Sequence, residues 1–119
     1  MKRHNFKNLK IWQKGFEIAT ASYNLTGSFP KEEKFGLISQ MNRSAVSIPS
    51  NIVEGTAKSS DKHFLIFLEN ALGSSFEWQT QLIMSNNVGL VNDHDFTTYE
   101  KQIIEIQRMI NSFMDKIKS

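Results

Sequence analysis

The sequence predicts an all-α protein, an antiparallel up-down four-helix bundle, on three observations. Apolar residues recur three and four positions apart in four long segments, which is the spacing of a helix that buries one face. Short segments rich in glycine, proline, serine or asparagine separate these four segments, and short connections make successive helices antiparallel neighbours. No segment has the period of two that is typical of a strand. The 119 residues are expected to form one domain over 1–119.

The first helix is expected from about residue 9 to residue 25, with Asn8 as its N-cap. The second is expected from about residue 30 to residue 53, because Pro30 suits a first helical turn. It contains Pro49, and a proline inside a helix costs about 3 kcal/mol and bends it. The predicted apolar face of the first helix consists of Leu9, Trp12, Phe16, Ala19 and Tyr23.

The third helix is expected from about residue 61 to residue 86, with Ser59 or Ser60 as its N-cap. The fourth is expected from about residue 93 to residue 118, capped by Asn92 or Asp93. Several of these apolar faces are wider than a monomeric bundle needs, and surplus apolar surface usually enters a subunit interface. We therefore favour a homo-oligomer over a monomer with an unusually well packed core. On the third helix the widening residues are Leu65, Leu72, Phe76 and Ile83.

The net charge is only +2, but basic residues dominate the N-terminus. Five of them precede the first acidic residue, Glu17. The general interpretation is a solvated tail that leads into a helix, and the functional alternative is a basic arm for nucleic acid. The five are Lys2, Arg3, Lys7, Lys10 and Lys14.

Several kinds of site are not supported by the sequence. With no cysteine, the chain has neither thiol nucleophiles nor thiolate metal sites, and no Glu-x-x-His pair suggests a di-iron centre. No phosphate-binding glycine loop is found. We expect no metal and no cofactor. No apolar run approaches the length of about 18 residues that indicates a membrane helix, so a cytoplasmic location is expected.

One polar stripe is a candidate site. Arg43, Ser47, Asn51 and Glu54 are spaced four, four and three residues apart on the second helix, and Glu77 precedes Trp78 on the third. A structural network that fixes helix register is the favoured interpretation. A recognition patch is the alternative, and a catalytic site is the least supported.

Several runs of the chain are similar to those of a known family. These runs are FKNLKIWQ at 6–13, YNLT at 23–26 and FPKEE at 29–33. They continue with GLISQMNRSAVSIPSNIVEG at 36–55, FLIFL at 64–68, GSSFE at 73–77 and Thr80. The chain resembles the four-helix-bundle proteins encoded in intervening sequences of bacterial 23S ribosomal RNA genes. It departs from the family pattern at Asn42, where relatives often carry a second basic residue beside Arg43.

This resemblance implies an antiparallel four-helix bundle that assembles as a ring-shaped homopentamer, and it implies no known enzymatic activity. The family is also similar to the accessory variability determinant of diversity-generating retroelements, a pentameric bundle that binds nucleic acid and a reverse transcriptase.

The expected function is therefore that of a non-enzymatic, oligomeric accessory or adaptor that contacts RNA or DNA phosphates. A protein-interaction scaffold is the alternative, with a protein partner in place of nucleic acid. The residues expected to contact phosphates are Lys2, Arg3, Lys7, Lys10 and Lys14, with Arg43 as an outlying candidate.

Overall fold

The computed structural model describes residues 5–119, and four long helices account for most of them. The helices are α1 (Lys10–Thr26), α2 (Ser39–Thr56), α3 (Asp61–Asn87) and α4 (Asp93–Lys118). Two short 3-10 turns, η1 (Phe6–Asn8) and η2 (Lys31–Glu33), and one π-helical turn, η3 (Lys34–Ile38), complete the secondary structure. The described part of the chain contains no strand.

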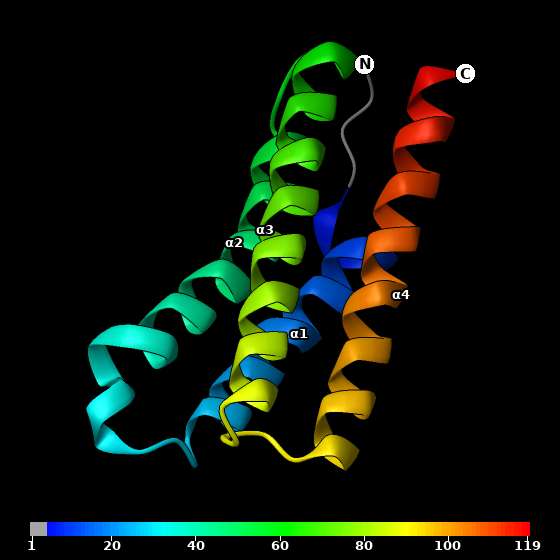
Figure 1. The fold of residues 1–119 in the computed structure, drawn as a ribbon. Coiled ribbons are helices and arrows are strands. Elements are labelled where there is room, and N and C mark those ends of the chain that lie inside the picture. Colours follow the sequence, from blue (N-terminus) through cyan, green and yellow to red (C-terminus); the bar gives the residue numbers. More distant parts are fainter. Residues whose placement is uncertain (1–4) are drawn as a thin grey trace.

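The four helices alternate in direction along an elongated molecule that measures 47 × 24 × 20 Å (Figure 1). α2 packs against both α1 and α3, whereas α4 packs against α3 and, less extensively, against α1. The predicted all-α, up-down arrangement is confirmed. The beginning of α2 leans away from the other helices, and the end of α2 runs alongside α3 (Figure 1).

Side-chain caps set the start of two helices as the sequence predicts. The Ser60 hydroxyl accepts a hydrogen bond from the backbone N–H of His63 at the start of α3. At the start of α4, the Asn92 side chain accepts one from the backbone N–H of Asp95. The predicted Asn8 cap is wrong, because Asn8 belongs to η1 and Leu9 precedes α1 without a side-chain cap.

The second helix begins nine residues later than Pro30, the position that the sequence predicts. The backbone of Gly36 leaves the helical region, with φ −102° and ψ −111°. The carboxylate of Glu33 then accepts a hydrogen bond from the Leu37 N–H, at 3.4 Å. Residues 31–38 therefore form two short turns, and the regular helix starts only at Ser39.

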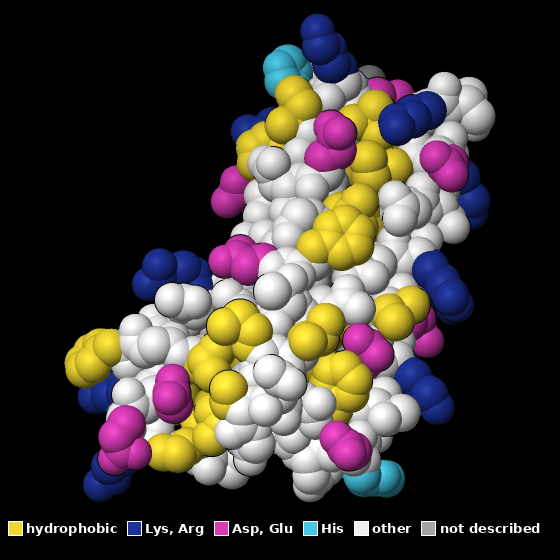
Figure 2. Space-filling view, in the orientation of Figure 1, with side chains coloured by type: hydrophobic (Ala, Val, Ile, Leu, Met, Phe, Trp, Pro, Cys, Tyr) yellow, Lys and Arg dark blue, Asp and Glu magenta, His cyan; other side chains and the backbone are white. Residues whose placement is uncertain are grey.

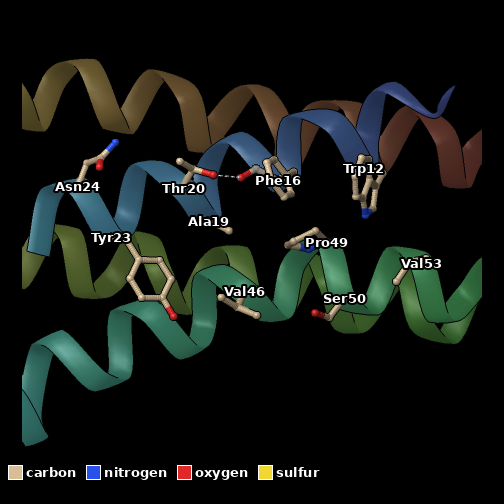
Figure 3. A pocket seen from close by; sticks show the side chains of 10 residues that line it. All are labelled: Trp12, Phe16, Ala19, Thr20, Tyr23, Asn24, Val46, Pro49, Ser50 and Val53. Atoms are coloured by element: carbon tan, nitrogen blue, oxygen red, sulfur yellow. Dashed lines mark hydrogen bonds between the residues drawn. The ribbon is translucent and has the colours of Figure 1, made fainter. Parts of the chain in front are cut away.

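Pro49 lies inside α2 and is buried against α1. Its neighbour across the interface is Gly15, where a Cβ atom would lie 3.2 Å from Ile48 Cγ2 and 3.4 Å from the Pro49 nitrogen. The missing side chain of Gly15 thus lets α1 approach α2 at the proline. The ribbon of α2 bends close to Val46 and Pro49 (Figure 3), as expected where a proline ring displaces the preceding turn.

The core is a continuous cluster of aliphatic and aromatic side chains from all four helices. Trp78 of α3 is its largest fully buried member, and its ring meets that of Tyr99 of α4 with centroids 6.4 Å apart. A second ring pair, Phe64 and Phe113, joins the same two helices with centroids 5.7 Å apart. These contacts hold α4 against α3 at two levels of the bundle.

The contact between the end of α2 and α3 generates a stability prediction. A Cβ atom on Gly55 would lie 2.7 Å from Phe64 Cδ1 and 3.1 Å from Phe67 Cβ. Because Phe64 is buried, Gly55→Ala should lower the free energy of unfolding by about 1–3 kcal/mol in urea denaturation. Gly73→Ala is the control, because nothing lies within 4 Å of its Cβ position; it should raise stability by about 0.5–1 kcal/mol. Equal stabilisation of both variants would contradict the close contact.

Candidate functional site

The basic residues predicted at the N-terminus do not form one uniform patch. Lys2 and Arg3 lie outside the described residues, whereas Lys7 and Lys10 are exposed. Lys14 is bound by acidic neighbours, with its Nζ 3.3 Å from Glu105 Oε1 and 3.5 Å from Glu17 Oε2. The hydrogen bond and charge of Glu105, followed by the charge of Glu17, raise the pKa of Lys14. Lys14 is therefore positively charged, and the carboxylates of Glu17 and Glu105 offset its charge.

Lys10 joins two basic residues of α4 that the sequence analysis missed. A hollow of about 440 Å³ between the start of α1 and the last part of α4 is lined by Lys10, Arg108 and Lys116. No acidic residue lines it, and its apolar walls include Ile11 and Phe113. We call this hollow the basic α1/α4 surface. Figure 2 shows Lys and Arg side chains along the outer edge that α4 forms, with single acidic side chains between them.

The predicted polar stripe is divided between two environments. The Asn51 side-chain N–H₂ group donates to the Ser47 carbonyl at 2.8 Å and to the Ser47 hydroxyl at 2.9 Å. The Ser47 hydroxyl also shares a hydrogen bond of 2.8 Å with that of Ser74 on α3. Ser47 and Asn51 of the predicted stripe are thus hydrogen-bonded to each other, and Ser47 also reaches α3. The other three predicted residues, Arg43, Glu54 and Glu77, are exposed. They form no ion pair within residues 5–119, so they do not join the Ser47–Asn51 hydrogen bonds.

A different and more deeply buried network connects three helices. The Trp78 indole N–H of α3 donates to the Ser22 hydroxyl of α1 at 2.9 Å. Ser22 in turn donates to Asn42 Oδ1 of α2, also at 2.9 Å, and Thr26 donates to the same oxygen at 3.2 Å. Asn42 therefore accepts two hydroxyl protons. A basic side chain at this position could not accept either of them.

An apolar groove separates the outer faces of α1 and α2 (Figure 3). It has a volume of about 460 Å³. The side chains of Phe16 and Tyr23 are 54% and 57% exposed, although the sequence places both on a core-facing stripe. The reason is that α1 packs against α2 through a neighbouring line of residues, which includes Gly15 and Ser22. We call this the α1/α2 groove; its lining residues are Trp12, Phe16, Ala19, Thr20, Tyr23, Asn24, Val46, Pro49, Ser50 and Val53.

A second exposed apolar surface lies on α3. Phe76 and Ile83 are 49% and 47% exposed, and Leu65 and Leu72 are half-buried beside them. We call these four residues the α3 apolar face. Figure 2 shows hydrophobic side chains gathered over the seam between α3 and α4. The predicted surplus of apolar surface on the third helix is therefore present in the folded chain.

Two other kinds of site are not found in the part of the chain that the structure describes. Within residues 5–119, no three His, Asp or Glu side chains gather closely enough to hold a metal ion. Over the same range, no helix combines the length and apolarity that crossing a bilayer requires.

Comparisons with known proteins support the four-helix fold. A family model described as 23S rRNA-intervening sequence protein matches residues 7–112. A crystal structure from Bacteroides thetaiotaomicron, of a protein with unknown function from the S23 ribosomal protein family, superposes with a TM-score of 0.82. The two chains share 25% sequence identity, and the match covers 87% of this chain and 97% of the other. No curated protein matches the chain.

The buried Trp78 network generates a prediction about stability. Ser22→Ala should lower the free energy of unfolding by about 1–3 kcal/mol, because the fully buried indole N–H loses its acceptor. Urea denaturation followed by circular dichroism measures the change. Ser28→Ala is the matched control, since the exposed Ser28 hydroxyl bonds only to the Leu25 carbonyl; it should stay within about 0.5 kcal/mol of the parent. If the two variants are equally stable, the network does not stabilise the bundle.

Proposed function

The chain belongs to the 23S rRNA-intervening sequence protein family, and we propose that it is a non-enzymatic, homo-oligomeric accessory protein that binds nucleic acid in the cytoplasm. The observation that carries this proposal is the basic α1/α4 surface. It gathers Lys10, Arg108 and Lys116 around a hollow that no acidic side chain lines. Cationic side chains in such an arrangement bind phosphates without regard to base sequence.

A small net positive charge supports nucleic-acid binding only where the positive side chains gather on one surface. A net charge of +2 over 119 residues gives a weak overall field. Acidic side chains already compensate Lys14, but Arg108 and Lys116 have no ion-pair partner within residues 5–119. Repetition of the basic α1/α4 surface in an oligomer would multiply these contacts and raise the overall affinity.

The α3 apolar face supports the oligomer. Phe76 and Ile83 lie seven residues apart on one stripe and are about half exposed. Exposed apolar clusters of this kind are typical of subunit interfaces. We propose that this face contributes to a homopentameric ring, the assembly that the family resemblance implies.

A protein-interaction scaffold is the second candidate function. The α1/α2 groove and the α3 apolar face both favour it, because two separate apolar surfaces can bind a partner protein as well as another copy of the chain. Its signature would be affinity for a protein partner without any dependence on nucleic acid.

The nucleic-acid proposal predicts a salt-dependent interaction at the basic α1/α4 surface. We expect Arg108→Gln/Lys116→Gln to weaken binding of a labelled DNA duplex in fluorescence anisotropy. For each phosphate that the variant no longer neutralises, the slope of log K against log salt should fall by about 0.9 for a duplex. Lys58→Gln/Lys62→Gln removes the same charge between the end of α2 and the first turn of α3 and should leave the slope nearly unchanged. Equally weakened binding in both double variants, or no binding to RNA or DNA at low salt, would contradict the proposal.

The oligomer proposal predicts a mass that depends on the α3 apolar face. Sedimentation equilibrium of the unmodified protein should give five times the chain mass of 13.7 kDa. Ile83→Glu should shift the mass toward the monomer, because burial of an unpaired carboxylate in an interface is costly. Val88→Glu places the same charge at an exposed site outside this face and should preserve the pentamer. A monomeric parent protein would refute the assembly.

A further inference from the structure

Aromatic side chains of α1 line one side of the groove, next to an aromatic side chain of η1. The Phe6 and Trp12 rings meet edge to face with centroids 5.1 Å apart, and Trp12 and Phe16 follow at 5.4 Å. Tyr23 lies two turns further along α1, at the other end of the groove lining. Figure 3 shows the rings of Trp12, Phe16 and Tyr23 bordering the space between α1 and α2. More than half of the surface of Phe16 and Tyr23 is open to a ligand.

The groove has no charged lining residue, but it offers polar groups beside the rings. The side chains of Asn24 and Ser50 have no hydrogen-bond partner within residues 5–119. An amide group both donates and accepts hydrogen bonds, as a hydroxyl does. The lining therefore suits a flat, neutral ligand with polar edges.

A second hollow continues the groove at Tyr23. It has a volume of about 600 Å³, and Lys31 and Lys34 line it without any acidic residue. Neither lysine forms an ion pair within residues 5–119; the Lys34 Nζ lies 5.5 Å from the centroid of the exposed Phe35 ring. The neighbouring Glu33 carboxylate is engaged with the Leu37 N–H. The two ammonium groups, and neither of the adjacent carboxylates of Glu32 and Glu33, therefore line the hollow at the Tyr23 end of the groove.

The groove offers aromatic faces on which neutral bases can stack, and the adjoining hollow offers lysines that can bind phosphates. This combination matches the chemistry of a single nucleic-acid strand. We propose that the α1/α2 groove binds single-stranded RNA or DNA, with bases stacked on Phe16 and Tyr23 and phosphates at Lys31 and Lys34. A duplex cannot bind this way, because its base faces are already stacked on one another. An apolar peptide would fill the groove but leave the lysine-lined hollow unused. The inference rests on the proposed nucleic-acid function and names the ligand class of a second surface.

The decisive variants separate stacking from simple apolar contact. Phe16→Leu keeps an apolar side chain but removes the aromatic face, whereas Phe16→Trp keeps an aromatic face; Tyr23→Leu and Tyr23→Phe form the same matched pair. With a labelled oligothymidine strand in fluorescence anisotropy, each leucine variant should bind about tenfold more weakly. The tryptophan and phenylalanine variants should bind like the parent. Because both positions are exposed, all four variants are expected to fold, which circular dichroism checks.

Trp12 gives a readout from within the groove. Stacking of a thymine near the Trp12–Phe16 pair should quench tryptophan fluorescence on titration with unlabelled oligothymidine. Trp78 is fully buried and should contribute a constant signal, so Trp12→Phe should abolish the quenching. Lys31→Gln/Lys34→Gln should reduce the slope of log K against log salt by about 0.7 for each phosphate that is no longer neutralised.

Each contrary outcome has a distinct meaning. If leucine and tryptophan at position 16 bind oligothymidine equally well, stacking in the groove is refuted. If the leucine variants change the sedimentation mass but not the oligothymidine affinity, the groove is an interface between copies and the inference is wrong. If only Arg108→Gln/Lys116→Gln weakens binding, the proposed function stands and this inference falls. If the parent protein binds no nucleic acid, both fail.

Discussion

The burial of Trp78 is the constraint on which the arrangement of the first three helices depends. A fully buried indole N–H must find an acceptor, since leaving it unpaired costs about 1–3 kcal/mol. Ser22 supplies that acceptor only when α1 has the correct rotation and height relative to α3. Asn42 then accepts from Ser22 and Thr26, and this sets the height of α2 against α1. The relative placement of α1 and α2 forms the groove, so this network positions the surface to which we assign single-stranded nucleic acid.

Pro49 and Gly15 shape that surface in a second way. The close contact at Gly15 brings α2 against α1 at the proline, and the bend of α2 near Val46 lets its beginning lean outward. Between the leaning segment and the end of α1 lies the hollow lined by Lys31 and Lys34. The residue that is least suited to a helix interior thus adjoins an open surface. A straight α2 would pack more closely there and leave less room for a ligand.

Periodicity in the sequence predicted the helices well, because the apolar spacing of a helix is a local property. The predicted range of the fourth helix, 93–118, coincides with α4. The start of α2 was mispredicted because it depends on the backbone of Gly36 and on the Glu33 hydrogen bond, which no apolar pattern records. Helical spacing also placed Arg43 and Glu54 on one stripe with Ser47, but α3 covers only part of that stripe. Which residues become a site depends on the neighbouring helix.

Sequence periodicity could not predict either candidate binding surface, because each depends on how two helices pack. The two surfaces also differ in the kind of ligand that they can bind. Lys10 meets Arg108 and Lys116 only because α1 packs against α4, whereas Phe16 and Tyr23 face the other side of α1, toward α2. Phosphate contacts weaken steeply with salt because they release counterions. Stacking between neutral rings releases none, so salt weakens it far less. A duplex can use only the first kind of contact, and a single strand can use both. At low salt the protein would hold either ligand, and rising ionic strength would increasingly favour the single strand.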